Sequence, residues 1–244
     1  GMSERTYSPG AAGNAACNVA TLVGHTTMIG VVGADANADI LRAEFARFGV
    51  NVDSLVVDAE RPTNTYGKLL ARAVNGVPQE VLRTDTPTPP PLSGAVERDV
   101  IAAIESSAAR ADAIVVVDQV GSVATPAVRT AIADIAKNRG LLTVADSRGR
   151  IDGFKGLRVA VPNEGELGQS FGIDTTTPGG LAEAGRKLLA VCESGLITCG
   201  ERGISGFAKD VTFTSPALAR RVVDVTGAGD TVTAIVTLAL LAGA

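Results

Sequence analysis

The chain has 244 residues, of which 45% are hydrophobic, 20% are charged and 3% are aromatic, and its formal net charge at pH 7 is −4. This balance is that of a globular protein and excludes an intrinsically disordered chain. The negative net charge argues against a nucleic-acid-binding protein, which usually carries a basic face.

The cysteines and the apolar segments bear on where the protein works. Cys17, Cys192 and Cys199 form no C-x-x-C pair and are odd in number, which is typical of reduced core thiols. The N-terminus lacks the apolar segment of a secretory signal, and the longest apolar run, residues 231–244, is too short to span a bilayer. We therefore expect a cytoplasmic protein with no membrane partner.

The first half of the chain alternates helix-like and strand-like segments. Helical patterns occur at residues 15–23 and 37–48, and residues 26–33 are strand-like. Three short strand-like runs follow within residues 52–85, where N-G-V-P at residues 75–78 predicts a hairpin turn. We interpret residues 52–85 as a small β lid inserted into the main domain.

The second half repeats helices and apolar strands after a stiff proline-rich connector at residues 86–94. Strands buried on both faces read as apolar runs, so this pattern predicts a mostly parallel sheet in a three-layer α/β/α domain. The predicted elements are, in chain order, residues 96–109 (helix), 113–118 (strand), 127–138 (helix), 141–146 (strand), 158–162 (strand), 180–195 (helix) and 196–200 (strand).

Polar residues stand where these predicted strands end. Asp118, Asp146 and Asn163 each come at the end of an apolar strand, and Thr198 and Gly200 close the last one. Ligands of open parallel sheets bind at the carboxyl ends of the strands. A binding site is therefore expected at this edge.

The most specific motif is D-V-T-G-A-G-D at residues 224–230, which precedes an apolar helix. Gly227 and Gly229 let the backbone approach a ligand closely, and the free N–H groups at the helix start favour an anion. Asp230 would repel a resting phosphate, but it suits a base that takes the proton of a hydroxyl attacking that phosphate. The alternative is that Asp230 caps the helix. No P-loop motif or nicotinamide-binding G-x-G-x-x-G motif is found.

The motif resembles the signature of ribokinase/PfkB-type sugar kinases, and in particular that of the kinase module of the bifunctional heptose 7-phosphate kinase/ADP-heptose synthase family. The resemblance runs over nearly the whole chain and implies one ribokinase-like domain over residues 1–244. The segments that carry it, in the family's order, are PGAAGNAACNVA, RPTNT, QEVLRTD, ADSRGR, VPNEGE and DVTGAGD.

The resemblance implies phosphorylation of a sugar or sugar phosphate by ATP with Mg²⁺, for which a heptose phosphate is one candidate. Asp230 is implied to be the base, and the backbone of Gly227, Ala228 and Gly229 to hold the phosphoryl group. Thr198, Gly200 and Gly203 are implied to lie near the nucleotide. Asn163 and Glu166 are implied to act on Mg²⁺ through water.

The substrate residues follow in the same way. Asn14 and Gly10 are implied to contact the sugar, Arg83 and Asp85 to face it from the lid, and Arg148 to face a phosphate. Structural alternatives stay open for each motif: Asn14 as a helix cap, Arg83 and Asp85 as a solvated cross-strand pair, and Arg148 as a surface charge. The N-x-x-E pair at residues 163–166 is equally compatible with a helix start.

The chain departs from the family pattern at several points. Ala11 replaces a glycine, and Tyr66 replaces a lysine. Arg148 also replaces a lysine, and the charge of arginine has a different geometry from that of lysine. We also expect the family's first strand, which ends in G-D-x-x-x-D, and its last helices to be missing.

Two other functions therefore stay open. One is a degenerate kinase homologue that binds a nucleotide or sugar phosphate without turnover, and the other is a nucleoside kinase. Family analogy further implies a homodimer paired through the lids.

Overall fold

The computed structural model describes residues 4–71, 79–119, 123–218 and 226–244. Its strands are β1 (Gly30–Val32), β2 (Leu55–Val57), β3 (Tyr66–Ala71), β4 (Gln79–Asp85), β5 (Ala113–Asp118), β6 (Leu142–Ser147), β7 (Leu157–Ala160), β8 (Cys192–Thr198), β9 (Ile204–Ala208) and β10 (Val211–Ser215). Its helices are α1 (Gly10–Val23), α2 (Ala36–Arg47), α3 (Gly94–Ala108), α4 (Pro126–Arg139), α5 (Glu164–Phe171), α6 (Gly180–Leu188) and α7 (Ala228–Leu241), with short 3-10 turns η1 (Ile151–Gly153) and η2 (Gly200–Arg202).

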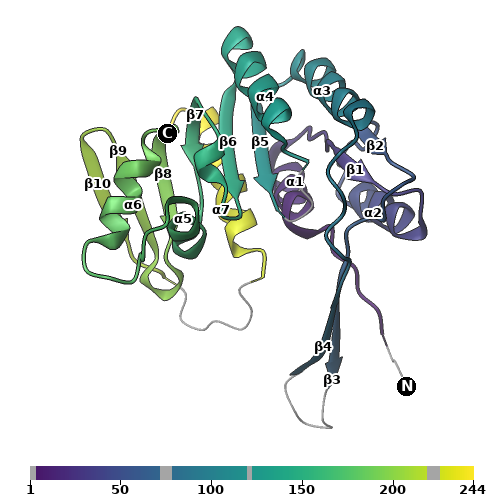
Figure 1. Cartoon of the computed structure of the whole chain (residues 1–244), viewed down its shortest axis with the longest axis horizontal. Helices are drawn as coiled ribbons and strands as arrows, with labels where there is room; N and C mark the ends of the chain where they lie inside the picture. Colours follow the sequence, from purple (N-terminus) through teal and green to yellow (C-terminus); the bar gives the residue numbers. More distant parts are fainter. Residues whose placement is uncertain (1–3, 72–78, 120–122, 219–225) are drawn as a thin grey trace.

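A six-stranded sheet forms the centre of the molecule, in the order β10-β9-β8-β7-β6-β5 (Figure 1). β5, β6, β7 and β8 run parallel, and β9 and β10 extend the sheet as antiparallel strands. The carboxyl ends of the four parallel strands therefore meet at one edge. This arrangement confirms the predicted mostly parallel sheet.

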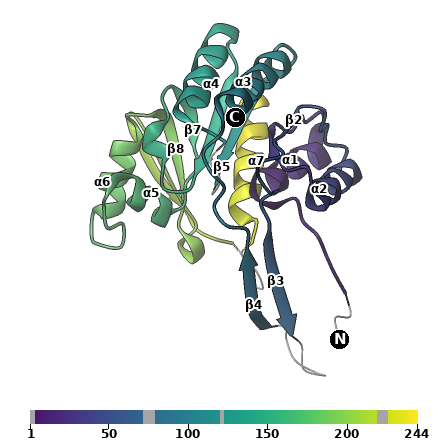
Figure 2. The ribbon, with the colours of Figure 1, turned by 45° about the vertical axis from the view of Figure 1, so that its right-hand side comes forward.

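Helices cover both faces of the sheet and complete the predicted three layers (Figures 1 and 2). On one face, Val144 of β6 belongs to the apolar cluster that α7 covers with Val232 and Val236. On the other face, the next residue, Ala145, packs in the cluster that contains Leu167 of α5. Successive strand residues point to opposite faces, which explains why β6 is apolar throughout.

A second, two-stranded sheet lies beside the first, where β1 pairs in parallel with β2. Val31 and Val56 pack in the same apolar cluster as Ile114 and Val116 of β5. Among the described residues, however, no hydrogen-bonded ladder joins β1 to β5. Residues 55–57 were predicted as part of the lid. They belong to this sheet instead, because they pair with β1, which lies outside residues 52–85.

The lid is reduced to a hairpin of β3 and β4, which projects away from the body of the molecule (Figure 2). Tyr66 pairs with Asp85, and the register shifts between Leu69 and Leu70. Its turn, predicted at residues 75–78, lies outside the described residues. Nearly all side chains of the two strands are exposed.

Local signals account for most helix boundaries, with two differences from the predicted ones. The side chain of Thr125 accepts a hydrogen bond from an amide of the first turn of α4, and Gly140 ends that helix at φ 67°. The helix predicted over residues 180–195 ends at Leu188, because the chain turns there and enters β8. α1 begins at Gly10 instead of residue 15.

The remaining sequence-based expectations concern cysteines and membrane segments. All three cysteines are buried and form no disulfide, as expected of core thiols. None of the helices in the described ranges combines the length and apolar character needed to cross a membrane.

The core around α6 provides a test of this packing. Leu188 is 0% exposed, and a Cβ placed on Gly195 of β8 would lie 2.5 Å from Leu188 Cδ2. We expect Leu188→Ala to lower the free energy of unfolding by about 2–5 kcal/mol in urea denaturation, because it leaves a cavity. Leu22→Ala, at a side chain on α1 that is 53% exposed, is the control and should have little effect.

Candidate active site

A glycine bend opens the last helix. Gly227 has φ 81°, a left-handed conformation that favours glycine, and α7 begins at the next residue. The first amides of a helix have no partner within the helix, and Gly227 offers no side chain to cap them. Ala228 is exposed, and a Cβ on Gly229 would meet nothing within 4 Å. The first turn of α7 therefore has no side-chain cap, and the described residues leave the positions of Ala228 and Gly229 uncovered. The predicted strand end at Asp224 lies outside the described residues.

Asp230 lies in the first turn of α7 and is 9% exposed. Its Oδ2 accepts a hydrogen bond of 2.8 Å from Nδ2 of Asn14. Burial raises the pKa of Asp230, and the hydrogen bond from Asn14 acts in the opposite direction. Asp230 is thus a partly desolvated carboxylate held in one orientation, as a base requires.

Asn14 comes from α1, which packs beside α7 (Figure 2). It lies inside the helix, which excludes a capping role, and its Oδ1 accepts a hydrogen bond from the Ser8 hydroxyl. Gly10, the other predicted sugar residue, is the first residue of this helix and has φ 77°. The structure therefore brings Asn14 and Asp230 together, although 216 positions separate them in the chain.

A cleft of about 410 Å³ lies beside this pair. Asn14, Gly227 and Thr231 line it, together with residues of the segment before α1 and of the end of α2. Asn18 also lines it, and its Nδ2 donates a hydrogen bond of 3.1 Å to Thr231 Oγ1. Asn18 was not predicted as a site residue, although its spacing of four from Asn14 places both on one helix face.

The expected polar strand ends meet at the same edge of the sheet. Asp118 ends β5 and accepts hydrogen bonds from Arg150 (2.8 Å) and Ser147 (2.9 Å). Asp146, near the end of β6, is 6% exposed. Burial, followed by the negative charges of Glu166, Asp230 and Asp118, raises the pKa of Asp146 to about 8. Four carboxylates, from two strands and two helices, therefore influence one another.

Asn163 and Glu166 form a capping box at the start of α5. Asn163 Oδ1 accepts a hydrogen bond from the Glu166 amide (2.9 Å), and Glu166 Oε2 accepts one from the Asn163 amide (3.0 Å). The structural alternative for this pair is therefore present. Burial raises the pKa of Glu166, while the charge of Arg148 acts to lower it. Arg148, which is exposed, thus lies near the acidic edge.

A magnesium nucleotide needs oxygen ligands for the cation and donors for its phosphates. No group of three Asp, Glu, His or Cys side chains in the described ranges forms a ready-made metal site. Mg²⁺ usually keeps several waters and binds through one or two carboxylates and the substrate phosphates. Asp146 Oδ1 is buried and has no hydrogen-bond partner among the described residues. This unsatisfied oxygen and the uncapped amides of α7 fit a cation and a phosphate, respectively.

The predicted nucleotide residues follow β8. Thr198 ends the strand and forms an isolated bridge with Asn163. Gly200 and Gly203 flank the η2 turn with positive φ angles of 58° and 88°. A Cβ on Gly203 would lie 2.0 Å from the carbonyl oxygen of Ser215. The turn is therefore held close to the end of β10 and beside the N-terminus of α5.

The predicted lid residues contact each other. Arg83 Nε lies 2.7 Å from Asp85 Oδ1, and both side chains are exposed. The Arg83 guanidinium also stacks over the Tyr66 ring at 5.1 Å. The two residues therefore form a solvated pair, but the pair lies along one strand, β4, and not across two strands as the alternative foresaw.

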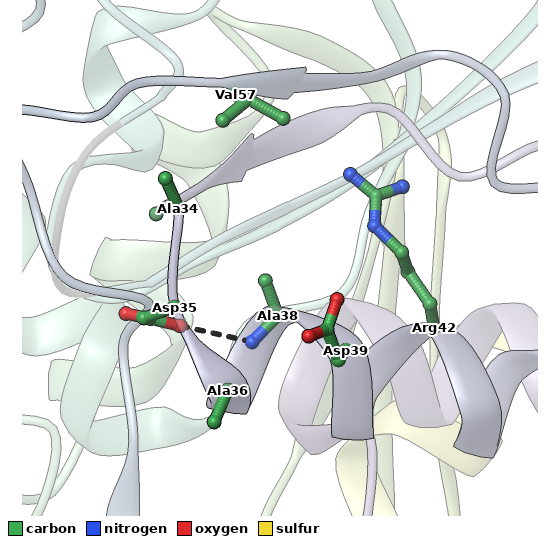
Figure 3. A pocket seen from close by; sticks show the side chains of 8 residues that line it. Ala34, Asp35, Ala36, Ala38, Asp39, Arg42 and Val57 are labelled. Atoms are coloured by element: carbon green, nitrogen blue, oxygen red, sulfur yellow. Dashed lines mark hydrogen bonds between the residues drawn. The ribbon is translucent and has the colours of Figure 1, made fainter.

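Another cleft, of about 340 Å³, lies at the start of α2 (Figure 3). Asp35 Oδ1 accepts hydrogen bonds from the Ala38 amide (2.9 Å) and the Thr63 hydroxyl (2.8 Å), and Oδ2 accepts one from the Thr63 amide (2.8 Å). Its carboxylate is thus occupied in structural contacts. The cleft shares no lining residue with the one beside Gly227, and we assign it no role.

Comparison with known proteins gives consistent matches. The family model described as pfkB family carbohydrate kinase matches residues 2–244. The bifunctional protein HldE of Geobacter metallireducens is 32% identical over 238 residues, which are 96% of this chain and 48% of that protein. HldE of Caulobacter vibrioides is 34% identical over 249 residues, 100% of this chain and 50% of that protein. The chain therefore spans about half the length of the curated relatives it matches.

Solved structures agree on the fold. Phosphofructokinase-2 from Escherichia coli in complex with potassium has a TM-score of 0.76 at 18% identity, covering 95% of this chain and 74% of that chain. Arabidopsis thaliana ribokinase complexed with ribose and ATP has a TM-score of 0.69 at 21% identity, with 95% and 74% covered. At these identities the likeness concerns the fold alone.

The raised pKa of Asp146 makes stability depend on pH. An unfolded aspartate titrates near about 4, whereas Asp146 in the folded chain titrates at about 8. The folded state holds the extra proton between these values, so its contribution to stability falls as pH rises through this window. We expect urea denaturation in EDTA to show this loss, at up to about 1.4 kcal/mol per pH unit. Asp146→Asn should flatten the slope, and an unchanged slope would contradict the assignment.

Proposed function

The chain belongs to the pfkB family of carbohydrate kinases, and on this premise we propose that it transfers the γ-phosphoryl group of ATP to a hydroxyl of a sugar or sugar phosphate. The observation that carries the proposal is the position of Asp230. Its carboxylate accepts a hydrogen bond from Asn14 at a helix N-terminus that has no side-chain cap.

In the proposed reaction, Asp230 accepts the proton of the acceptor hydroxyl. The hydroxyl oxygen forms a bond to the γ-phosphorus while the bond from that phosphorus to the β,γ-bridging oxygen breaks, and ADP leaves. The backbone amides of Gly227, Ala228 and Gly229 bind the oxygens of the moving phosphoryl group. A positioned base contributes about 10²–10⁴-fold, and stabilisation of charge on the phosphoryl group is usually the larger effect.

The acceptor is proposed to enter the cleft beside Asp230. Asn14 already donates to the carboxylate, and Asn18 lies one turn further along the same helix, so both amides can bind sugar hydroxyls. Gly10 begins that helix and lets the sugar approach its backbone. The sequence resemblance to heptose 7-phosphate kinase modules makes a heptose phosphate the first acceptor to test.

The nucleotide is proposed to lie along the edge formed by Thr198, Gly200 and Gly203. Asn163 and Glu166 are proposed to act through water on Mg²⁺, which neutralises phosphate charge when bound. Their capping contacts hold them at the start of α5, at the same edge of the sheet as Asp146.

Three charged residues complete the proposed site. Arg148 is proposed to face a phosphate, and its effect on the pKa of Glu166 supports this position. Arg83 and Asp85 would have to exchange their mutual contact for the substrate when the hairpin closes as a lid. We also propose a cytoplasmic location. The three buried cysteines form no disulfide, which is typical of a reducing compartment.

The role of Asp230 is tested by Asp230→Asn, which keeps the shape of the side chain and removes its basicity. We expect turnover to fall at least about a hundredfold, while ATP affinity measured by calorimetry changes little. Turnover is measured as ADP formation with ribose, fructose 6-phosphate, heptose 7-phosphate and a nucleoside as acceptors.

Asp39→Asn is the matched control, because Asp39 also lies in the first turn of a helix, α2, but away from the cleft. It should leave turnover unchanged. Near wild-type turnover of Asp230→Asn would contradict the assignment of the base. Binding of ATP without turnover on any acceptor would favour the degenerate homologue, and exclusive use of the nucleoside would favour a nucleoside kinase.

The hairpin also supports the proposed homodimer. Leu69 and Leu70 of β3 and Val81 and Leu82 of β4 are all exposed, and an isolated two-stranded hairpin is marginally stable in water. Pairing of two hairpins would bury these side chains. We expect a dimer in light scattering, and a monomer for Leu82→Glu but not for Leu22→Glu on α1. A monomeric wild-type protein would contradict the proposal.

A further inference from the structure

The cleft beside Gly227 contains a carboxylate that the proposed transfer does not use. Glu44 of α2 lines this cleft together with Arg47 and with Phe48, the residue that ends the helix. We call these three residues the α2 end of the cleft. Arg47 Nη1 donates hydrogen bonds of 3.1 and 2.8 Å to the two carboxylate oxygens of Glu44. The side chain of Glu44 is 14% exposed, whereas that of Arg47 is 69% exposed. Glu44 is therefore a largely buried acid in the wall of the proposed acceptor cleft.

The packing of α2 against α1 fixes where Glu44 lies. The next residue, Phe45, belongs to the same apolar cluster as Ala16 and Cys17 of α1. A Cβ on Gly13 of α1 would lie 3.0 Å from Cζ of Phe45, so the two helices are in close contact there. Burial, followed by the charge of Glu44, raises the pKa of Cys17. The Glu44 carboxylate therefore lies near the face of α1 that carries Cys17.

That face of α1 connects Glu44 to the base. Cys17 is three residues after Asn14 and one before Asn18, and residues three and four apart are neighbours on a helix surface. All three line the cleft, and Asn14 donates a hydrogen bond to Asp230. In both ribbon views, α1 lies between α7 and α2 (Figures 1 and 2). An acceptor whose reacting hydroxyl lies at Asp230 can therefore extend along α1 to the α2 end of the cleft.

The groups at the α2 end of the cleft suit hydroxyls better than a phosphate. A carboxylate has about four lone-pair sites, and Arg47 occupies two, so Glu44 can still accept hydrogen bonds from hydroxyl groups. The charges of Glu44 and Arg47 offset each other, which leaves little net charge to attract an anion. Tyr7 and Phe48 are exposed and line the same cleft. Their rings offer apolar surface for the C–H groups of a sugar.

We propose that Glu44 determines the specificity for the acceptor, because it accepts hydrogen bonds from acceptor hydroxyls that do not react. The acceptor then presents a neutral polyol segment to the α2 end of the cleft, and any phosphate that it carries lies away from Glu44. This inference rests on the proposed kinase function, which places the reacting hydroxyl at Asp230.

The first test separates binding of the acceptor from the chemical step. Glu44→Gln keeps the shape of the side chain and removes its charge. Ribose, fructose 6-phosphate and heptose 7-phosphate serve as acceptors, and we expect KM for the one that the wild type uses best to rise roughly tenfold. The value of kcat should change little, because these hydrogen bonds are present in the ground state and the transition state alike. KM for ATP should stay as in the wild type.

Glu183→Gln is the matched control, because Glu183 also pairs with a cation of its own helix, Lys187 of α6, and does not line the cleft. It should leave both KM values unchanged. A wild-type acceptor KM in Glu44→Gln, or an equal rise in Glu183→Gln, overturns the inference.

A second measurement covers the case in which Glu44→Gln does not fold, and it needs no turnover. At least one of the three sugars, added to the wild-type chain without ATP, should shift the backbone NMR signals of residues 14–18 and 44–48. Inorganic phosphate should leave the signals of residues 44–48 unchanged. A shift of these signals by phosphate would assign this end of the cleft to an anion and overturn the inference, as would the lack of a shift there with all three sugars.

The outcomes separate this inference from the kinase proposal. If no acceptor is phosphorylated but a sugar shifts the signals of residues 44–48, the kinase proposal fails and the polyol site stands. If turnover is observed and the acceptor KM does not depend on Glu44, only the polyol site fails.

Discussion

The hydrogen bond from Asn14 to Asp230 is the contact on which the site depends. It joins the first and last helices of the described chain, which pack side by side on one face of the sheet. The left-handed bend at Gly227 turns the chain into α7 so that its third residue meets α1. That bend places the start of α7 beside the cleft, which Gly227 and Thr231 line.

The parallel sheet concentrates negative charge at one edge, and each carboxylate there is handled differently. Asp118 is neutralised by Arg150, and Asp230 is hydrogen-bonded by Asn14. Glu166 serves its own helix as a cap. Asp146 alone has a buried oxygen without a partner among the described residues. The carboxylates at this edge therefore differ in their partners: Asp118 and Glu166 make contacts that stabilise the fold, whereas Asp146 has an oxygen that no described residue contacts.

Local sequence patterns predicted the features that depend on neighbouring residues, namely the type of each element and the caps of the helices. The alternation of apolar strands and capped helices predicted the three-layer domain, and the glycine motif at residues 224–230 predicted an acid at a helix start. The pattern failed where pairing is distant: β2 looks like part of a hairpin until β1 is seen beside it. The apolar run after Leu188 fits a helix and a strand equally, so its boundary was misplaced. Asn18 was not predicted as a site residue, because a single amide side chain in a helix belongs to no recognisable motif.

The two sheets have one further consequence for the cleft. β1 and β5 share an apolar core but no main-chain ladder among the described residues. Residues of α2, which follows β1, and of α7, which covers the six-stranded sheet, both line the cleft beside Gly227. Apolar side chains pack across this seam, and packed surfaces slide over one another more readily than hydrogen-bonded strands separate. Small shear along the seam would widen or narrow the acceptor cleft while leaving the acidic edge of the large sheet intact.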